Sequence, residues 1–230
     1  MKKYFEKHET LISILLIAVY LLTNSYCMDK FGLTDYRSFM VNLFLSLIIL
    51  FFIVKNGLLG YYGLNKFPKL NKYLYFIPLL LIISVNLWTG ININNSVSEI
   101  VFYMLSMIFV GFLEEIIFRG FLFKMMAKDN VKSAIIVSSL TFGIGHIINL
   151  FNGASLVPTL LQVCYATLAG FMLVTIFQKS GSLWPCIITH SLVNALSIFN
   201  VDNNVTLYLA PLFLIIVSAW YTIYLRKKIN

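Results

Sequence analysis

Residues 110–120 read Val-Gly-Phe-Leu-Glu114-Glu115-Ile-Ile-Phe-Arg119-Gly, and the rest of the chain is organised around them. They lie inside a predominantly apolar run from residue 97 to residue 123. A charged side chain at membrane depth costs from about 3 kcal/mol to about 10 kcal/mol or more, so three charges must be paired or used. Glu115 and Arg119 are four residues apart, on one helix face, whereas Glu114 is turned about 100° away. We therefore expect Glu115 to pair with Arg119 and Glu114 to be free to act.

The composition is that of an integral membrane protein. The chain has 230 residues, of which 60% are hydrophobic and 11% are charged, and its mean hydropathy is +0.87. About 20 apolar residues cross a bilayer as a helix. The chain is therefore predicted to be an all-α, polytopic bundle of about eight transmembrane helices, forming one domain over residues 1–230. The net charge of +8 comes mainly from lysines in short loops, so it reflects topology, and no nucleic-acid partner is expected.

Eight apolar segments are predicted to cross the bilayer. The first begins at Leu11 behind a charged head and looks like a signal peptide. Because residues 24–26 form a poor cleavage site, we expect this segment to be retained as a helix. The other segments lie at about 38–54, 73–90, 97–123, 133–151, 155–178, 182–200 and 205–225.

The loop charges predict the orientation of the chain. If the eight segments alternate in direction, fourteen of the 17 basic residues fall on one side, and only Lys30 and Arg37 fall on the other. Cytoplasmic loops are rich in Lys and Arg, so both termini are predicted to be cytoplasmic. The fourteen residues are Lys2, Lys3, Lys7, Lys55, Lys66, Lys69, Lys72, Lys124, Lys128, Lys132, Lys179, Arg226, Lys227 and Lys228.

Two further segments carry polar residues at membrane depth. The fifth contains Phe142, His146 and Asn149, one helical turn apart, and the seventh contains His190 and Asn194 at positions i and i+4. Ionisable residues inside a membrane usually have a function. Glutamates, histidines and an asparagine together favour a hydrolytic site, in which a base takes a proton from water and donors stabilise the oxyanion.

Each polar residue also has a structural interpretation. A lone histidine or asparagine often joins membrane helices by a hydrogen bond of about 1 kcal/mol, and Asn86 and Asn149 are interpreted in this way. Apart from Phe142, the Tyr and Phe residues are expected to face lipid or the interface. Cys186 lies one turn before His190 as a possible nucleophile, although buried cysteines are more often apolar fillers. A proton-relay transporter would need inverted repeats, which we do not find.

Three motifs occur in order on separate apolar segments: Glu114-Glu115-x-x-x-Arg119, Phe142-x-x-x-His146 and His190-x-x-x-Asn194. Together they resemble the signature motifs of the CAAX protease and bacteriocin-processing family, also called the CPBP or Abi family. Its members are intramembrane endopeptidases and include the type II CAAX prenyl endopeptidases. The resemblance covers about residues 97–200, which would be the catalytic core.

The resemblance implies a role for each polar residue of the motifs. Glu114 would be the general base that activates a water molecule, and His146 would help to position that water. His190 and Asn194 would form the oxyanion hole. No cofactor is expected, but a zinc ion held by Glu114, His146 and His190 is the alternative, even though the chain has no HExxH motif.

The remaining motif residues would support the site. Glu115 with Arg119 would brace it, and Phe142 would pack beside His146. By the same resemblance, the protein would be a multi-pass protein of a bacterial plasma membrane. Its partners would be membrane lipids and a hydrophobic peptide or protein substrate, such as a CAAX-like end, a leader, a pheromone or a bacteriocin peptide. A non-catalytic scaffold, immunity or regulatory protein is the alternative within the family.

Overall fold

The computed structural model describes residues 2–67, 77–201 and 203–228, and within these ranges it contains helices and no strand. The α-helices are α1 (Lys2–Phe31), α2 (Tyr36–Lys55), α3 (Ile77–Ser84), α4 (Val97–Glu115), α5 (Lys124–Met126), α6 (Val131–Gly145), α7 (Leu156–Ser180), α8 (Trp184–Leu196) and α9 (Ala210–Lys228). Short 3-10 or π-helical segments adjoin them: η2 (Val85–Leu87), η3 (Ile116–Phe123), η4 (His146–Leu150), η5 (Ser197–Phe199) and η6 (Val205–Leu209). Each of the eight predicted apolar segments is helical in its described part, which confirms the all-α bundle.

Among the described residues, six helices are long and apolar enough to cross a membrane. The third and seventh predicted segments form shorter apolar helices, Ile77–Leu87 and Trp184–Phe199. At 1.5 Å per residue the second of these is roughly 24 Å long, which is less than the roughly 30 Å of a hydrocarbon core. The protein is thus an integral, multi-pass membrane protein in which two helices are short.

Part of the third predicted segment cannot be compared with the structure. Residues 73–76, and Lys69 and Lys72 in the preceding loop, lie outside the described residues. The cytoplasmic location of both termini stays a prediction from the loop charges.

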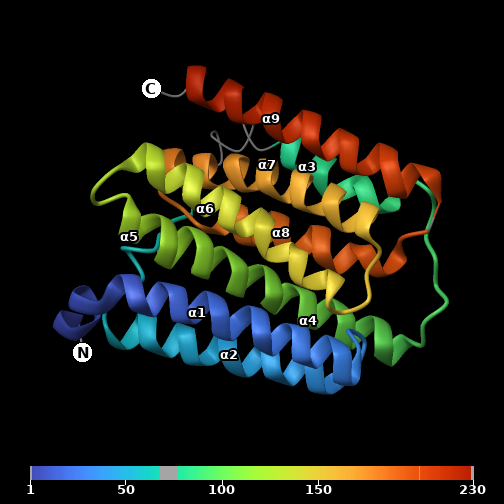
Figure 1. The fold of residues 1–230 in the computed structure, drawn as a ribbon, viewed down its shortest axis with the longest axis horizontal. Coiled ribbons are helices and arrows are strands. Elements are labelled where there is room, and N and C mark those ends of the chain that lie inside the picture. Colours follow the sequence, from blue (N-terminus) through green and yellow to red (C-terminus); the bar gives the residue numbers. More distant parts are fainter. Residues whose placement is uncertain (1, 68–76, 202, 229–230) are drawn as a thin grey trace.

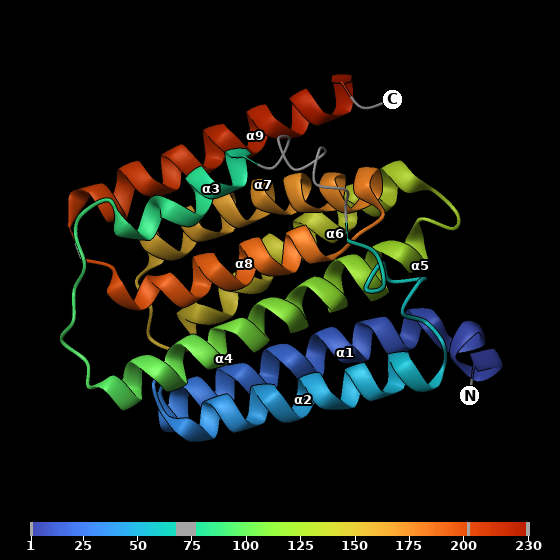
Figure 2. The same ribbon diagram turned by 180° about the vertical axis from the view of Figure 1, so that it is seen from behind.

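Helix α4 runs through the middle of the bundle (Figure 1). Helices α1 and α2 lie side by side along one flank of it, and α6, α7 and α8 lie along the other, with α3 and α9 outside them (Figures 1 and 2). Helix α4 packs against α2 and α8, and its continuation η3 packs against α1 and α6. Side chains near the end of α4 are therefore within reach of helices from both flanks.

The close approach of α4 and α8 depends on Gly111. A Cβ atom built at this position would meet Oγ of Ser191 and would lie 2.7 Å from the Ser191 backbone nitrogen and 2.8 Å from its Cα. Small residues let membrane helices approach closely. Gly111 lies one turn before Glu115, and Ser191 follows His190, so this contact brings His190 to the two glutamates.

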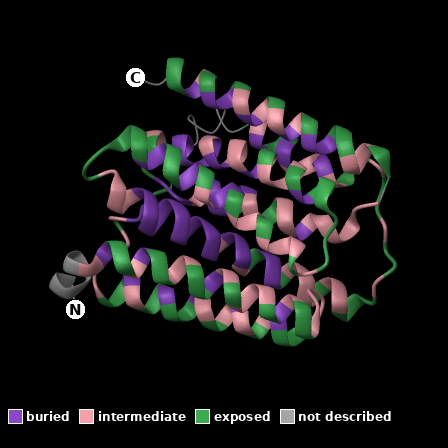
Figure 3. Cartoon of the chain, in the orientation of Figure 1, coloured by how far each residue is buried: buried purple, intermediate pink, exposed green. Residues whose placement is uncertain are grey.

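The segment η3, which continues α4, is a π-helix rather than an α-helix. All of its residues, including Arg119, are buried, and it forms a continuous buried stretch in the centre of the bundle (Figure 3). The i,i+4 spacing of Glu115 and Arg119 predicts α-helical geometry through this stretch. The π-helix departs from that prediction at a place where such turns often mark functional sites.

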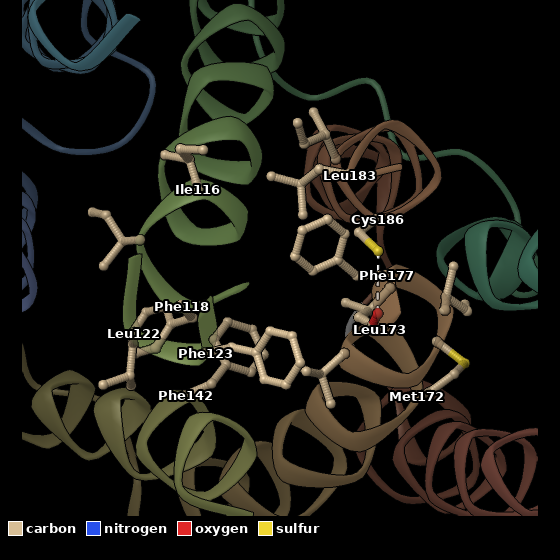
Figure 4. Close-up of a cluster of buried hydrophobic side chains, with 14 of the residues drawn as sticks. Ile116, Phe118, Leu122, Phe123, Phe142, Met172, Leu173, Phe177, Leu183 and Cys186 are labelled. Atoms are coloured by element: carbon tan, nitrogen blue, oxygen red, sulfur yellow. Dashed lines mark hydrogen bonds between the residues drawn. The ribbon is translucent and has the colours of Figure 1, made fainter. Parts of the chain in front are cut away.

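A cluster of apolar side chains fills the space between η3, α6, α7 and α8 (Figure 4). The expectation that most aromatic side chains face lipid is wrong for several residues, because a bundle of this many helices has an interior that large side chains must fill. These buried aromatic residues include Tyr20, Tyr62, Phe118, Phe121 and Tyr221.

Candidate active site

Glu114 lies in the last turn of α4 and contacts two other helices. Its Oε1 atom accepts a hydrogen bond of 2.7 Å from the hydroxyl of Tyr20 on α1, and its Oε2 atom lies 3.2 Å from Nε2 of His190 on α8. The residue is only 7% exposed. Glu114 is thus left out of the Arg119 ion pair, as the sequence predicts, but it contacts residues of two other helices that spacing within one helix does not reveal.

Glu115 carries the second carboxylate and is completely buried. Its Oε1 atom lies 3.2 Å from Nη1 of Arg119 and 2.8 Å from Nδ1 of His190. The contact with Arg119 is the i,i+4 pair that the sequence predicts. Since Arg119 is a permanent cation, Glu115 acts as an acceptor, and the Nδ1–H group of His190 is the donor in the second contact.

Arg119 is also completely buried, and its guanidinium carbon lies 4.1 Å from the centroid of the Phe142 ring. Among the described residues its nitrogen atoms have no hydrogen-bond partner. The ion pair with Glu115 and the aromatic face of Phe142 are therefore the contacts that offset its lost hydration. Removing one member of a buried ion pair typically costs about 3–5 kcal/mol.

Phe142 packs between the two histidines. Its ring centroid lies 5.4 Å from that of His146 and 5.5 Å from that of His190, in edge-to-face geometry in both cases. The contact with His146 is the one that the sequence predicts, and the contact with His190 is additional. Aromatic pairs of this kind contribute about 0.5–1.5 kcal/mol beyond the area they bury, so Phe142 holds both imidazoles in fixed orientations.

Four residues that the sequence singles out share one cavity. His146 begins η4 where α6 ends, and Asn194 lies one turn after His190 on α8. Both line a cavity of about 390 Å³ together with Glu114 and His190. The other walls are mostly apolar and come from α3, α4, α7, α8 and α9. A largely apolar cavity with a few convergent polar groups is typical of a binding site for a hydrophobic ligand.

A smaller cavity of about 190 Å³ also reaches Glu114 and His146. It is lined by α1 and by the end of α6 with η4, and its walls include Asn24, Ser25 and Asn152. The hydroxyl of Ser25 donates a hydrogen bond of 2.8 Å to Oδ1 of Asn152. Glu114 and His146 therefore border both cavities.

The zinc site that the sequence left open would draw on Glu114, His146 and His190. Both ring nitrogens of His190 face carboxylates, with Nε2 3.2 Å from Oε2 of Glu114 and Nδ1 2.8 Å from Oε1 of Glu115. Among the described residues, no group of three or more His, Cys, Asp or Glu side chains is placed to hold a metal ion.

Cys186 does not form a nucleophilic pair with His190. Its thiol is completely buried and donates a hydrogen bond of 3.2 Å to the carbonyl oxygen of Leu173 on α7 (Figure 4). Asn86 and Asn149 join helices, as the sequence predicts. Asn86 donates to the carbonyl oxygen of Val193 at 2.6 Å, and Asn149 donates to Oε1 of Gln162 at 2.8 Å.

Residues 95–196 match the family model described as type II CAAX prenyl endopeptidase Rce1-like. The match covers less than half of the 230 residues. Rce1-like proteins belong to the CPBP family of intramembrane proteases. No curated protein and no solved structure matches the chain.

The matched region, called the Rce1-like region below, runs from just before α4 to the end of α8. All seven residues that the sequence singled out lie inside it, namely Glu114, Glu115, Arg119, Phe142, His146, His190 and Asn194. Tyr20 lies outside it, on α1, and the sequence analysis missed it. The sequence offers one signal for Tyr20: its hydroxyl lies near the middle of the first apolar segment, and a buried tyrosine hydroxyl usually needs a hydrogen-bond partner.

Proposed function

We propose that the protein is an intramembrane endopeptidase in which Glu114 is the general base for hydrolysis of a peptide bond. One observation carries this proposal: Glu114, His146, His190 and Asn194, from three separate helical segments, line the same cavity. The family of the matching domain supports proteolysis as the reaction class. The roles given to individual residues are the proposal's own.

The proposed reaction uses the groups in that cavity. Glu114 takes a proton from a water molecule that His146 helps to position, and the water oxygen attacks the carbonyl carbon of the substrate. The carbonyl oxygen becomes an oxyanion, which accepts hydrogen bonds from the side-chain amide of Asn194 and from Nε2–H of His190, whose ring is protonated on both nitrogens in this step. Glu114 then passes its proton to the leaving nitrogen as the C–N bond breaks.

Glu115 and Arg119 support this reaction without contacting the substrate. Glu115 holds Nδ1 of His190 at 2.8 Å, and Arg119 holds Glu115 at 3.2 Å. These contacts keep Nδ1–H of His190 on Glu115, and they thereby direct Nε2 of the same ring toward Glu114. The two residues thereby fix the orientation of His190, and the carboxylates facing both ring nitrogens favour its doubly protonated form.

The proposed substrate is a hydrophobic peptide or the hydrophobic end of a protein. The apolar walls of the larger cavity suit such a chain, and the family supports a CAAX-like end. A leader, pheromone or bacteriocin peptide has the same character. We place the protein in a bacterial plasma membrane among lipids, with both termini in the cytoplasm, as the loop lysines favour.

Cleavage of hydrophobic peptides by the purified protein in detergent tests the proposal. A peptide library is incubated with the wild-type protein and with Glu114→Gln, and products are identified by mass spectrometry. We expect cleavage by the wild type and none by Glu114→Gln or His146→Ala. Asn194→Ala should keep a trace, since one oxyanion donor typically contributes about 10²- to 10³-fold in rate.

Glu99→Gln is the matched control. Glu99 lies in the first turn of the same helix and forms a capping box with Ser96 that glutamine preserves, so this variant should cleave at the wild-type rate. Full activity in Glu114→Gln would remove the base assignment. Restoration of a cellular phenotype by Glu114→Gln would instead favour a non-catalytic scaffold. Stoichiometric zinc that is lost together with activity would overturn the metal-free mechanism.

A further inference from the structure

We propose that Tyr20 of α1 is a positioning residue for Glu114, so that the active site extends beyond the Rce1-like region. The inference rests on the proposed function, because it assigns Tyr20 a part in the work of the general base. Tyr20 is 4% exposed, and its hydroxyl donates a 2.7 Å hydrogen bond to Oε1 of Glu114.

This hydrogen bond selects one orientation of the Glu114 carboxylate. The last torsion of a glutamate side chain has a broad, roughly two-fold preference, so backbone and rotamer leave the carboxylate plane free to turn. The Tyr20 hydroxyl occupies Oε1. Among the described residues Oε2 has no hydrogen-bond partner, although it lies 3.2 Å from Nε2 of His190. Oε2 is therefore the oxygen left to accept the proton from water.

Helix α1 is held in place at several points, which makes Tyr20 a fixed donor. The hydroxyl of Ser25 on α1 is bonded to Asn152, in the turn after η4. Toward the other end of α1, Glu9 forms an ion pair with Lys128 in the loop between α5 and α6. Between these contacts α1 packs against η3. A hydroxyl on a helix held in this way keeps its position when the site changes protonation.

The alternative is that Tyr20 only fills space. A buried tyrosine hydroxyl needs a partner wherever it lies, so the contact could serve the fold and not the reaction. The two roles differ in what the loss of the hydroxyl changes. A positioning role predicts a lower kcat at unchanged KM, whereas a space-filling role predicts changes in stability alone.

The test measures kcat and KM of the full-length protein in detergent, with a peptide that the wild type cleaves. We expect Tyr20→Phe to lower kcat about 10-fold or more, since losing a hydrogen bond to a charged group typically corresponds to at least a tenfold change in rate. KM should stay within about two-fold, because the hydroxyl makes no contact with the larger cavity. Tyr221→Phe is the control: Tyr221 is completely buried, and among the described residues its hydroxyl has no hydrogen-bond partner.

Wild-type kcat in Tyr20→Phe would overturn the inference, and so would an equal loss in Tyr221→Phe. If Tyr20→Phe does not stay folded in detergent, Tyr20→Gln and Tyr20→Leu carry the comparison, since these side chains are similar in size and only glutamine can donate. Equal kcat in that pair would also overturn it. Cleavage by Glu114→Gln refutes the proposed function, whereas an unchanged Tyr20→Phe beside an inactive Glu114→Gln refutes this inference alone.

Discussion

Replacement of Gly111 by alanine tests whether the contact between α4 and α8 sets the geometry of the site. The added Cβ atom would lie 2.7 Å and 2.8 Å from backbone atoms of Ser191, whereas carbon atoms are in favourable contact at about 3.5–4.0 Å. Backbone atoms cannot turn away as a side chain can. Helix α8 must therefore move by about 1 Å at this point.

This displacement would reach His190, the residue before Ser191. The 2.8 Å contact between His190 and Glu115 would lengthen to about 3.8 Å, beyond hydrogen-bond distance. Overpacking of this kind costs about 1–3 kcal/mol of folding free energy. A misplacement of about 1 Å in an active site can lower the rate about 10²-fold. We therefore expect Gly111→Ala to fold with reduced stability and to retain about 1% of the activity.

Peptide cleavage and thermal unfolding in detergent, measured on the same preparation, check this expectation. Gly145→Ala is the stability control, because its Cβ would meet the nearest atom of Leu21 at 3.6 Å, an ordinary contact. Alanine is favoured over glycine in helices by up to about 1 kcal/mol, so Gly145→Ala should be at least as stable as the wild type. Wild-type activity and stability in Gly111→Ala would refute the reasoning about α8.

Two further expectations concern charged residues. Arg119→Leu leaves the buried carboxylate of Glu115 without its cation and should lower the free energy of unfolding by about 3–5 kcal/mol. Thermal unfolding in detergent measures this loss. The double variant with Glu115→Gln should recover part of the lost stability, because it removes the unpaired carboxylate. Hydrogen bonds from Arg37 hold the pKa of Asp35 at about 2, below the ordinary 3.8, so the stabilisation is present above pH 3.8 and is lost as the pH falls toward 2. Asp35→Asn, which keeps the N-cap, should therefore melt below the wild type at pH 6, with a difference that shrinks below pH 3.8 and vanishes once the pH is below 2. A difference of the same size at pH 6 and at pH 2 would contradict this assignment.

The sequence predicts those parts of the site that depend on local spacing. Glu115 and Arg119 pair because they lie one turn apart, and Phe142 meets His146 for the same reason. Polar residues are costly at membrane depth, which made Glu114, His190 and Asn194 visible as candidates. The helical fold follows from apolar segments of spanning length.

Other features depend on contacts that no local pattern encodes. The Tyr20 hydrogen bond joins residues 94 positions apart in the chain, and a tyrosine in an apolar segment looks the same whether it faces lipid or a carboxylate. The approach of α8 at Gly111 and the π-helix of η3 arise from packing between helices. Sequence spacing therefore identifies the charged groups, but not which neighbours orient them.

The intrahelical origin of the Glu115–Arg119 pair has a consequence for biogenesis. Both residues belong to one continuous span, Val97–Met126, so they can neutralise each other as that span leaves the insertion machinery, before α8 has been synthesised. The cost of placing two ionised groups in lipid is thereby reduced at the earliest stage. The contacts of His190 form only when the later helix arrives, so assembly of the reactive centre follows insertion and does not drive it.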